Sequence, residues 1–149
     1  MDRETQSVLD SWGTGGLLLN YPMALDERNR RLFVVTRLPA RLVVVDTQHG
    51  THIATLPTIG DCDDVFYDEP RHRIYAIGGE DRIAVYQQRD ADHYEELGRI
   101  NTVSGARTGF FSAELDRLYV AVRERGSHLA EIRIFMPSAQ TARGQALAP

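Results

Sequence analysis

The sequence predicts an all-β fold built from one structural unit that occurs three times. The first observation is a triplet of Arg, an aliphatic residue and an aromatic residue, at Arg31–Phe33, Arg73–Tyr75 and Arg117–Tyr119, with spacings of 42 and 44 residues. The second is that short segments rich in Val, Ile, Phe and Tyr alternate with polar turn segments, as is typical of strands. The third is that no stretch repeats its apolar residues at helical spacing, so helices are not expected.

Each unit is predicted to contain its strands in a fixed order around the triplet. The strand before the triplet lies at Met23–Leu25, Val65–Tyr67 and Gly109–Phe111. The strand after it lies at Leu42–Val45, Ile83–Tyr86 and Ile132–Phe135. The first two units also have a fourth strand, at Thr51–Leu56 and Tyr94–Ile100, which the third unit lacks.

The count of strands predicts three four-stranded antiparallel sheets. The three units span approximately residues 20–62, 63–106 and 107–136, and residues 6–12 supply a spare strand that completes the third sheet. Residues 1–136 then form a single three-unit domain. The remaining residues, 137–149, are mostly Ala, Gln, Gly, Ser and Pro, with little to bury, and are expected to be disordered.

Four strands in roughly 42 residues is the size of one β-propeller blade. Residues 20–136 resemble the bacterial YVTN-type propeller repeat, as in YncE-like proteins. Phe33–Thr36 is nearest to the tetrapeptide that names the family, and Leu42–Thr47 resembles the strand and turn that follow it. Residues 60–64 and 105–109 resemble the family's linkers. The resemblance implies a propeller scaffold and no particular activity, because the scaffold is what defines the family.

Three blades are fewer than the usual four to eight, so the sequence leaves three arrangements open. The chain is the C-terminal part of a larger propeller, or half of a symmetric dimer with six blades. In the third arrangement it stands alone as a three-blade form with repacked ends. An open arc of blades would expose two apolar faces, which favour association.

Composition sets limits on the class of protein. The chain of 149 residues is 42% hydrophobic and 26% charged, which is typical of a folded domain. Its net charge of −4 argues against a nucleic-acid partner. The single cysteine, Cys62, is expected to be a packing residue. No signal peptide and no membrane span are recognised, and the compartment stays open, although the resembled family is often exported to the periplasm.

Candidate ligand-binding residues lie in the loops that lead into the first strand of each unit. In a propeller these loops share one rim near the axis, and the resemblance places the usual ligand face there. The loop of the second unit contains Asp61, Asp63 and Asp64, that of the third contains Arg107, and that of the first contains Tyr21. We predict that these five residues contribute to a binding site.

Each candidate also has a structural interpretation. Asp61, Asp63 and Asp64 have oxygens that suit Ca²⁺ or Mg²⁺, but a solvated turn that bonds to its own backbone is the favoured interpretation. Arg107 either faces a ligand or forms an ion pair with Asp63 or Asp64. Tyr21 is either a ligand contact or a core residue.

The leading functional prediction is a non-enzymatic binding or interaction module that holds a small ligand or another protein at its rim loops. It includes no catalytic residue, since no Gly-x-Ser-x-Gly motif is present, and it calls for no cofactor. Self-association through open blade faces, as a homodimer, is a further possibility. The alternatives are a hydrolase or lactonase-like propeller enzyme with a divalent metal at residues 61–64, and a truncated structural fragment without independent function.

Overall fold

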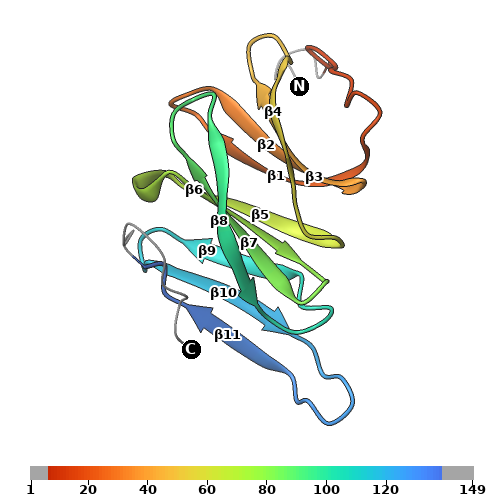
Figure 1. Cartoon of the computed structure of the whole chain (residues 1–149), viewed down its shortest axis with the longest axis vertical. Coiled ribbons are helices and arrows are strands. Elements are labelled where there is room, and N and C mark those ends of the chain that lie inside the picture. Colours follow the sequence, from red (N-terminus) through yellow and green to blue (C-terminus); the bar gives the residue numbers. More distant parts are fainter. Residues whose placement is uncertain (1–6, 139–149) are drawn as a thin grey trace.

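The structure, a computed structural model, describes residues 7–138, apart from the side chains of Asn20 and Tyr21, and forms three antiparallel sheets stacked along its long axis (Figure 1). In each sheet, consecutive strands pair with each other. The first sheet contains β1 (Leu18–Asp26), β2 (Arg31–Leu38), β3 (Ala40–Asp46) and β4 (His52–Pro57). The second contains β5 (Cys62–Asp68), β6 (Arg73–Gly78), β7 (Arg82–Gln88) and β8 (Tyr94–Asn101). The third contains β9 (Thr108–Ser112), β10 (Arg117–Val122) and β11 (Glu131–Phe135).

The repeated unit of the sequence is confirmed as a repeated sheet. The Arg of each triplet begins the second strand of its sheet, in β2, β6 and β10. The residue before that Arg is left-handed in all three turns, with φ values of 56° at Arg30, 51° at His72 and 54° at Asp116. Within the described chain the only helical element is the short 3₁₀ turn η1 (Glu69–Arg71), and no helix there is long and apolar enough to cross a membrane.

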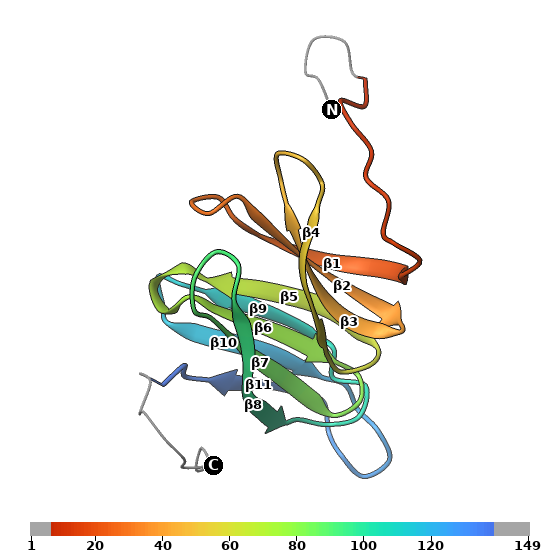
Figure 2. The ribbon, with the colours of Figure 1, turned by 45° about the horizontal axis from the view of Figure 1, so that its top comes forward.

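The prediction of three four-stranded sheets is wrong for the third sheet, which has three strands in the described chain. Residues 7–12, from the expected spare strand, form no strand, and residue 6 lies outside the described residues. Trp12 instead packs on Gly50, where an added Cβ would lie 2.2 Å from the indole. This segment therefore lies at the first sheet, away from β11 (Figure 2). Strands pair only when they lie about 4.8 Å apart, so it cannot complete the third sheet of its own chain.

The expected disordered tail is described only at Pro137 and Ser138. The Ser138 carbonyl oxygen accepts a hydrogen bond of 2.7 Å from Arg73 Nη1. Residues 139–149 lie outside the described residues, and the expectation of disorder there stays a prediction.

Two apolar cores hold the stack together, one between each pair of neighbouring sheets. The first joins Phe33 and Leu42 of the first sheet to Ile74 and Tyr86 of the second. The second joins the other face of the middle sheet to the third sheet, through Tyr75, Ile77, Ile83, Leu118 and Val120. A fully buried side chain of this size stabilises the fold by about 1.5–3 kcal/mol, so face-to-face packing is the main stabilising contact.

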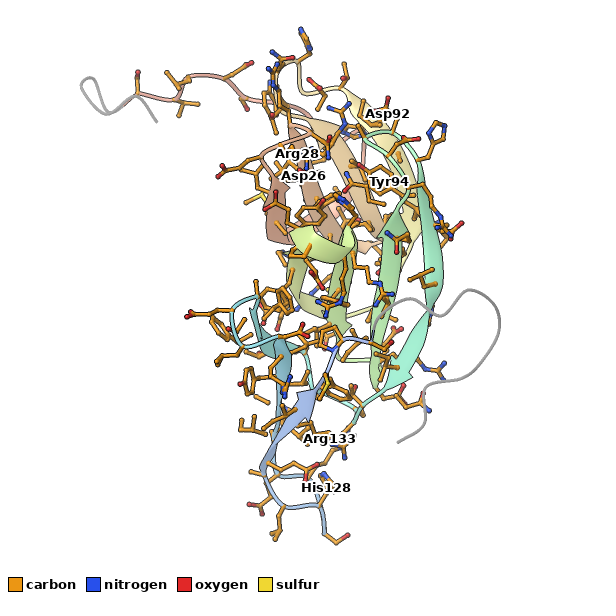
Figure 3. All side chains as sticks on the ribbon, turned by 90° about the vertical axis from the view of Figure 1, so that its left-hand side faces the viewer. Asp26, Arg28, Asp92, Tyr94, His128 and Arg133 are labelled. Atoms are coloured by element: carbon orange, nitrogen blue, oxygen red, sulfur yellow. The ribbon has the colours of Figure 1, made fainter. Side chains whose placement is uncertain are left out.

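Polar side chains near the turns also connect one sheet to the next. Arg31 of the first sheet binds Asp92 of the second at 2.8 Å, and Arg71 of the second binds Asp116 of the third at 2.8 Å. Figure 3 shows Asp26, Asp92 and Tyr94 close together at the junction of the first two sheets. The charged turns of the repeat therefore fix the position of each sheet on its neighbour.

Candidate functional site

The chain at the start of the inner strands, which are the first strands β1, β5 and β9 of the three sheets, has one backbone feature in common. Leu19, Asp61 and Gly105 are left-handed, with φ values of 57°, 52° and 86°. Their spacing is the same as that of the triplets. Glycine adopts this conformation without a steric cost, whereas Leu19 and Asp61 adopt it at some cost in backbone energy. The loop path is thus repeated, while the side chain that it presents differs in each unit.

Asp61 and Asp63 form an ion-pair network with one arginine on each side, which we call the rim cluster (Arg37, Asp61, Asp63 and Arg107). Arg37, in β2, lies 3.2 Å from Asp61 Oδ1 through Nη1 and also binds Asp63 through Nη2. Arg107 lies 2.5 Å from Asp61 Oδ2 through Nη1 and 2.7 Å from Asp63 Oδ2 through Nε. The cluster thus joins residues from all three sheets.

The rim cluster is electrically balanced and partly exposed. Each carboxylate contacts both guanidinium groups, and the four side chains retain between 22% and 40% of their surface. The hydrogen bond to Asp61, with the charges of Asp61 and Asp63, holds the pKa of Arg107 above its ordinary value. Because exposed ion pairs each contribute only about 0.2–1 kcal/mol, we expect the cluster to orient the loops more than to stabilise the fold.

A glycine makes room for the cluster in the middle sheet. Gly79 occupies the repeat position that Arg37 and Arg123 occupy in the other two sheets. A Cβ added at Gly79 would lie 2.2 Å from Asp61 Oδ2. The Gly79 N–H donates to the Asp61 carbonyl at 2.9 Å, and its own carbonyl accepts from Gly105 N–H at 2.8 Å. The absence of a side chain therefore lets the loops of the second and third sheets meet.

Asp64 points to the backbone of the next sheet and not to the rim cluster. The register of β5 on β6 is interrupted between Cys62 and Asp64. This irregularity lets the Asp64 side chain point in a different direction from those of Asp61 and Asp63. Asp64 Oδ2 accepts a hydrogen bond of 2.7 Å from Gly109 N–H. In the described chain this is the one hydrogen bond of the Asp64 side chain, and it comes from an uncharged donor at the junction of β5 and β9.

Tyr21, the candidate from the first unit, lies in β1 where the register on β2 is interrupted between Asn20 and Met23. Its backbone thus has the same place in the repeat as that of Asp63. The position of its side chain lies outside what the structure describes, so its role stays a prediction.

The three carboxylates of residues 61–64 do not converge on one point where a metal ion could bind. In residues 7–138 no group of three or more His, Cys, Asp or Glu side chains is placed to hold a metal ion. Asp61 and Asp63 are each engaged by two guanidinium groups, while Asp64 faces Gly109. A divalent ion would have to displace arginine from both ion-paired carboxylates before it could bind.

A groove of about 480 Å³ runs along the free edge of β5, between β1 and β9. We call it the axial groove. It carries apolar and acidic side chains together, among them Met23, Leu25, Phe66, Phe111, Asp63 and Asp64. Because β5 is the first strand of its sheet, one edge of its backbone faces this groove. The groove thus offers apolar surface, main-chain hydrogen-bonding groups and negative charge in one place.

Arg37 is the member of the rim cluster that sequence reasoning missed. It lies near the end of the second strand, away from the loops that lead into the inner strands. The available signal was its place six residues after the Arg of its triplet, a place that Arg123 shares in the third unit.

Two solved structures share this arrangement of sheets. A hydrazine synthase of Kuenenia stuttgartiensis matches with a TM-score of 0.61 and 13% identity, over 77% of this chain and 32% of its own. A chain from a nidogen–laminin complex matches with a TM-score of 0.57 and 17% identity, over 77% of this chain and 43% of its own. Both are β-propeller proteins. The chain therefore has a β-propeller-type fold.

This β-propeller-type chain spans less than half the length of either similar structure. At these identities the likeness establishes the fold alone. No protein-family model and no curated protein matches the sequence. The propeller scaffold expected from the YVTN-type resemblance is confirmed, whereas membership of the YncE-like family is not.

Proposed function

We propose that the protein is a non-enzymatic binding module that holds a segment of another protein in the axial groove, beside the rim cluster. The observation that carries this proposal is the composition of the groove, where apolar side chains lie between the inner strands and Asp63 and Asp64 lie among them. Its volume of about 480 Å³ falls within the range of ordinary binding sites, about 300–1,000 Å³.

The free edge of β5 favours an extended peptide as the ligand. An extended segment can bond to an exposed strand edge through its main chain, while its side chains fill pockets beside the strand. Phe66 and Phe111 offer apolar contacts, and the charge of Asp64 is not neutralised by an arginine in the described chain. The preferred partner is therefore a segment in which apolar and basic residues alternate.

The nidogen–laminin complex supports a role in protein binding. One chain of similar fold comes from an assembly of two proteins, so a scaffold of this kind occurs in a protein complex. The peptide preference proposed for this chain rests on its own groove and not on that likeness.

The experiment is an NMR titration of ¹⁵N-labelled protein with a hexapeptide of alternating Lys and Leu. We expect saturable shifts at the backbone amides of Met23, Leu25 and Phe66, which line the groove. Asp64→Asn should weaken binding about 5-fold, since a partly exposed charge pair contributes about 1 kcal/mol.

Two controls make the titration specific. Glu27→Gln removes an exposed carboxylate in the turn between β1 and β2 and should leave the affinity unchanged. A hexapeptide with Glu in place of Lys should not produce saturable shifts. Unchanged affinity in Asp64→Asn, or equal weakening by Glu27→Gln, would contradict the proposal.

A further inference from the structure

The third sheet exposes a face whose counterparts in the other two sheets are buried. We call the forward face of a sheet the side that packs on the following sheet. Tyr119, the aromatic residue of the third triplet, lies directly opposite Phe110 and Ile134. The corresponding residues Phe33 and Tyr75 are on the forward faces of the first and second sheets, 0% and 3% exposed. Phe110, Tyr119, Ile132 and Ile134 thus form the forward face of the third sheet.

Residues at equivalent positions of the three sheets differ in exposure, because the forward face of the third sheet has no further sheet of the described chain packed on it. Val44 and Val85 are paired with the triplet aromatic in their sheets and are 0% and 8% exposed, whereas Ile134 in the same position is 61% exposed. Two residues earlier, Leu42 and Ile83 are fully buried, whereas Ile132 is 63% exposed. The sequence therefore keeps apolar residues at positions that are buried only when a further sheet packs on them.

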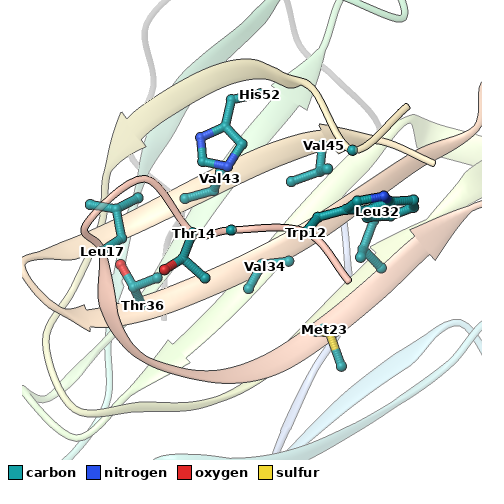
Figure 4. Close-up of a pocket in the computed structure, with 12 residues that line it drawn as sticks. Trp12, Thr14, Leu17, Met23, Leu32, Val34, Thr36, Val43, Val45 and His52 are labelled. Atoms are coloured by element: carbon teal, nitrogen blue, oxygen red, sulfur yellow. The ribbon is translucent and has the colours of Figure 1, made fainter. Parts of the chain in front are cut away.

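The first sheet, at the opposite end of the stack, has an apolar face on which the forward face of another sheet could pack. The rear face of the first sheet consists of Met23, Leu32, Val34, Val43 and Val45, all on the side away from the second sheet. Residues 12–17 lie over it and leave a cavity of about 170 Å³ (Figure 4). Met23 remains 61% exposed and Trp12 38% exposed. A gap of this kind forfeits dispersion contacts, so this segment is an incomplete cover.

We propose that a second copy of this chain covers the forward face of the third sheet with the rear face of its first sheet. The contact continues, with the same register, the packing that already joins the first sheet to the second and the second to the third. A two-fold axis then generates the same contact at the other end, so that both open faces of both copies are covered. The result is a closed ring of six sheets, in which residues 12–17 have left the rear face.

Light scattering on the full chain tests this proposal directly. We expect the wild type at micromolar concentration to have twice the mass of the 16.8 kDa chain. Ile134→Lys should weaken dimerisation about 10- to 100-fold, because a side chain of this size is removed from the buried contact. Leu115→Lys, at a residue that is 61% exposed in the turn between β9 and β10, is the matched control and should remain dimeric.

A second variant distinguishes this arrangement from pairing of two forward faces. Met23→Lys changes the rear face, at a residue that also borders the axial groove, and should weaken dimerisation to a similar extent. When the Ile134→Lys and Met23→Lys variants are mixed, one intact contact is restored, and a heterodimer should form. Ile134, Met23 and Leu115 are each more than half exposed in the single chain, so each variant should fold normally as a monomer. Circular dichroism will check this.

Two results would overturn the proposal. The first is a monomeric wild type, which would assign the forward face to a different partner. The second is a Met23→Lys variant that stays dimeric, which would show that the copies pair through other surfaces. Neither result bears on the axial groove, because the peptide titration reports on residues of the inner strands and can be read with a monomer.

Discussion

Gln88 Nε2 in the second sheet donates a hydrogen bond of 2.8 Å to Asp26 Oδ2 in the first sheet, and both side chains are buried. Asn29 adds two more, from its backbone N–H at 3.1 Å and its side-chain amide at 2.7 Å. Burial alone would raise the pKa of Asp26, but the hydrogen bonds from Gln88 and Asn29 outweigh burial and hold the pKa below its ordinary value. Two sheets are thus joined through a buried carboxylate that is ionised.

Asp26→Asn should lower the free energy of unfolding by about 1–3 kcal/mol, because an amide cannot accept all the hydrogen bonds that converge on the carboxylate. Urea unfolding followed by circular dichroism measures this change. Asp92→Asn is the matched control, since Asp92 is 58% exposed and its ion pair with Arg31 contributes about 1 kcal/mol or less. Equal losses in the two variants would contradict a special role for the buried carboxylate.

The same residue predicts how stability depends on pH. The pKa of Asp26 is lower in the folded chain than its ordinary value of 3.8. Its contribution is therefore complete above that value and is lost as the pH falls through the folded-state pKa. Between about pH 5 and about pH 2, the wild type should lose more stability than Asp26→Asn. Parallel curves for the two proteins, from unfolding at a series of pH values, would show that Asp26 does not carry this dependence.

Gly79→Ala should destabilise the fold by about 1–3 kcal/mol, since the new methyl group would overlap the Asp61 carboxylate. Adding Asp61→Gly to this variant should recover much of the loss, because glycine removes the overlap and suits the left-handed backbone. Gly13→Ala is the control, with no atom within 4 Å of the added Cβ. A double variant no more stable than Gly79→Ala would place the clash elsewhere.

Cys62 should be unreactive toward a disulfide reagent in the folded protein at pH 8. Its side chain is fully buried, and this burial is the main cause that raises the pKa of the thiol to about 12. The thiolate, which is the reactive form, is therefore nearly absent. One equivalent should react once urea unfolds the chain, with the same midpoint as circular dichroism. Rapid reaction in the absence of urea would mean that β5 opens locally.

The sequence predicted the sheets well because the information is local and repeated. The triplets, the turns and the order of strands depend on contacts within one unit, and all three units contain them. The position of residues 7–12 was not predictable in this way, because it depends on the distance between the two ends of the stack. A count of strands along the sequence contains no information about that distance.

For the candidate site, the sequence placed Asp61, Asp63 and Arg107 in loops that meet, and the structure brings them together. Arg37 was missed because it reaches the cluster from the end of a strand in the preceding sheet. Asp64 was grouped with its neighbours, whereas the irregular register of β5 turns it toward Gly109. Both differences arise from packing between sheets, which spacing along the chain does not encode.

The order of the strands has a consequence for folding during synthesis. The first sheet is complete by Pro57 and every strand pairs with its neighbour in sequence, so each sheet forms from contacts of short range. The partner of Asp26, however, is Gln88, near the end of β7. Until Gln88 has left the ribosome, Asp26 therefore keeps only its two hydrogen bonds from Asn29, and the apolar face with Phe33 and Leu42 lacks its cover. The first sheet is therefore open to mispairing through this apolar face until the second sheet forms.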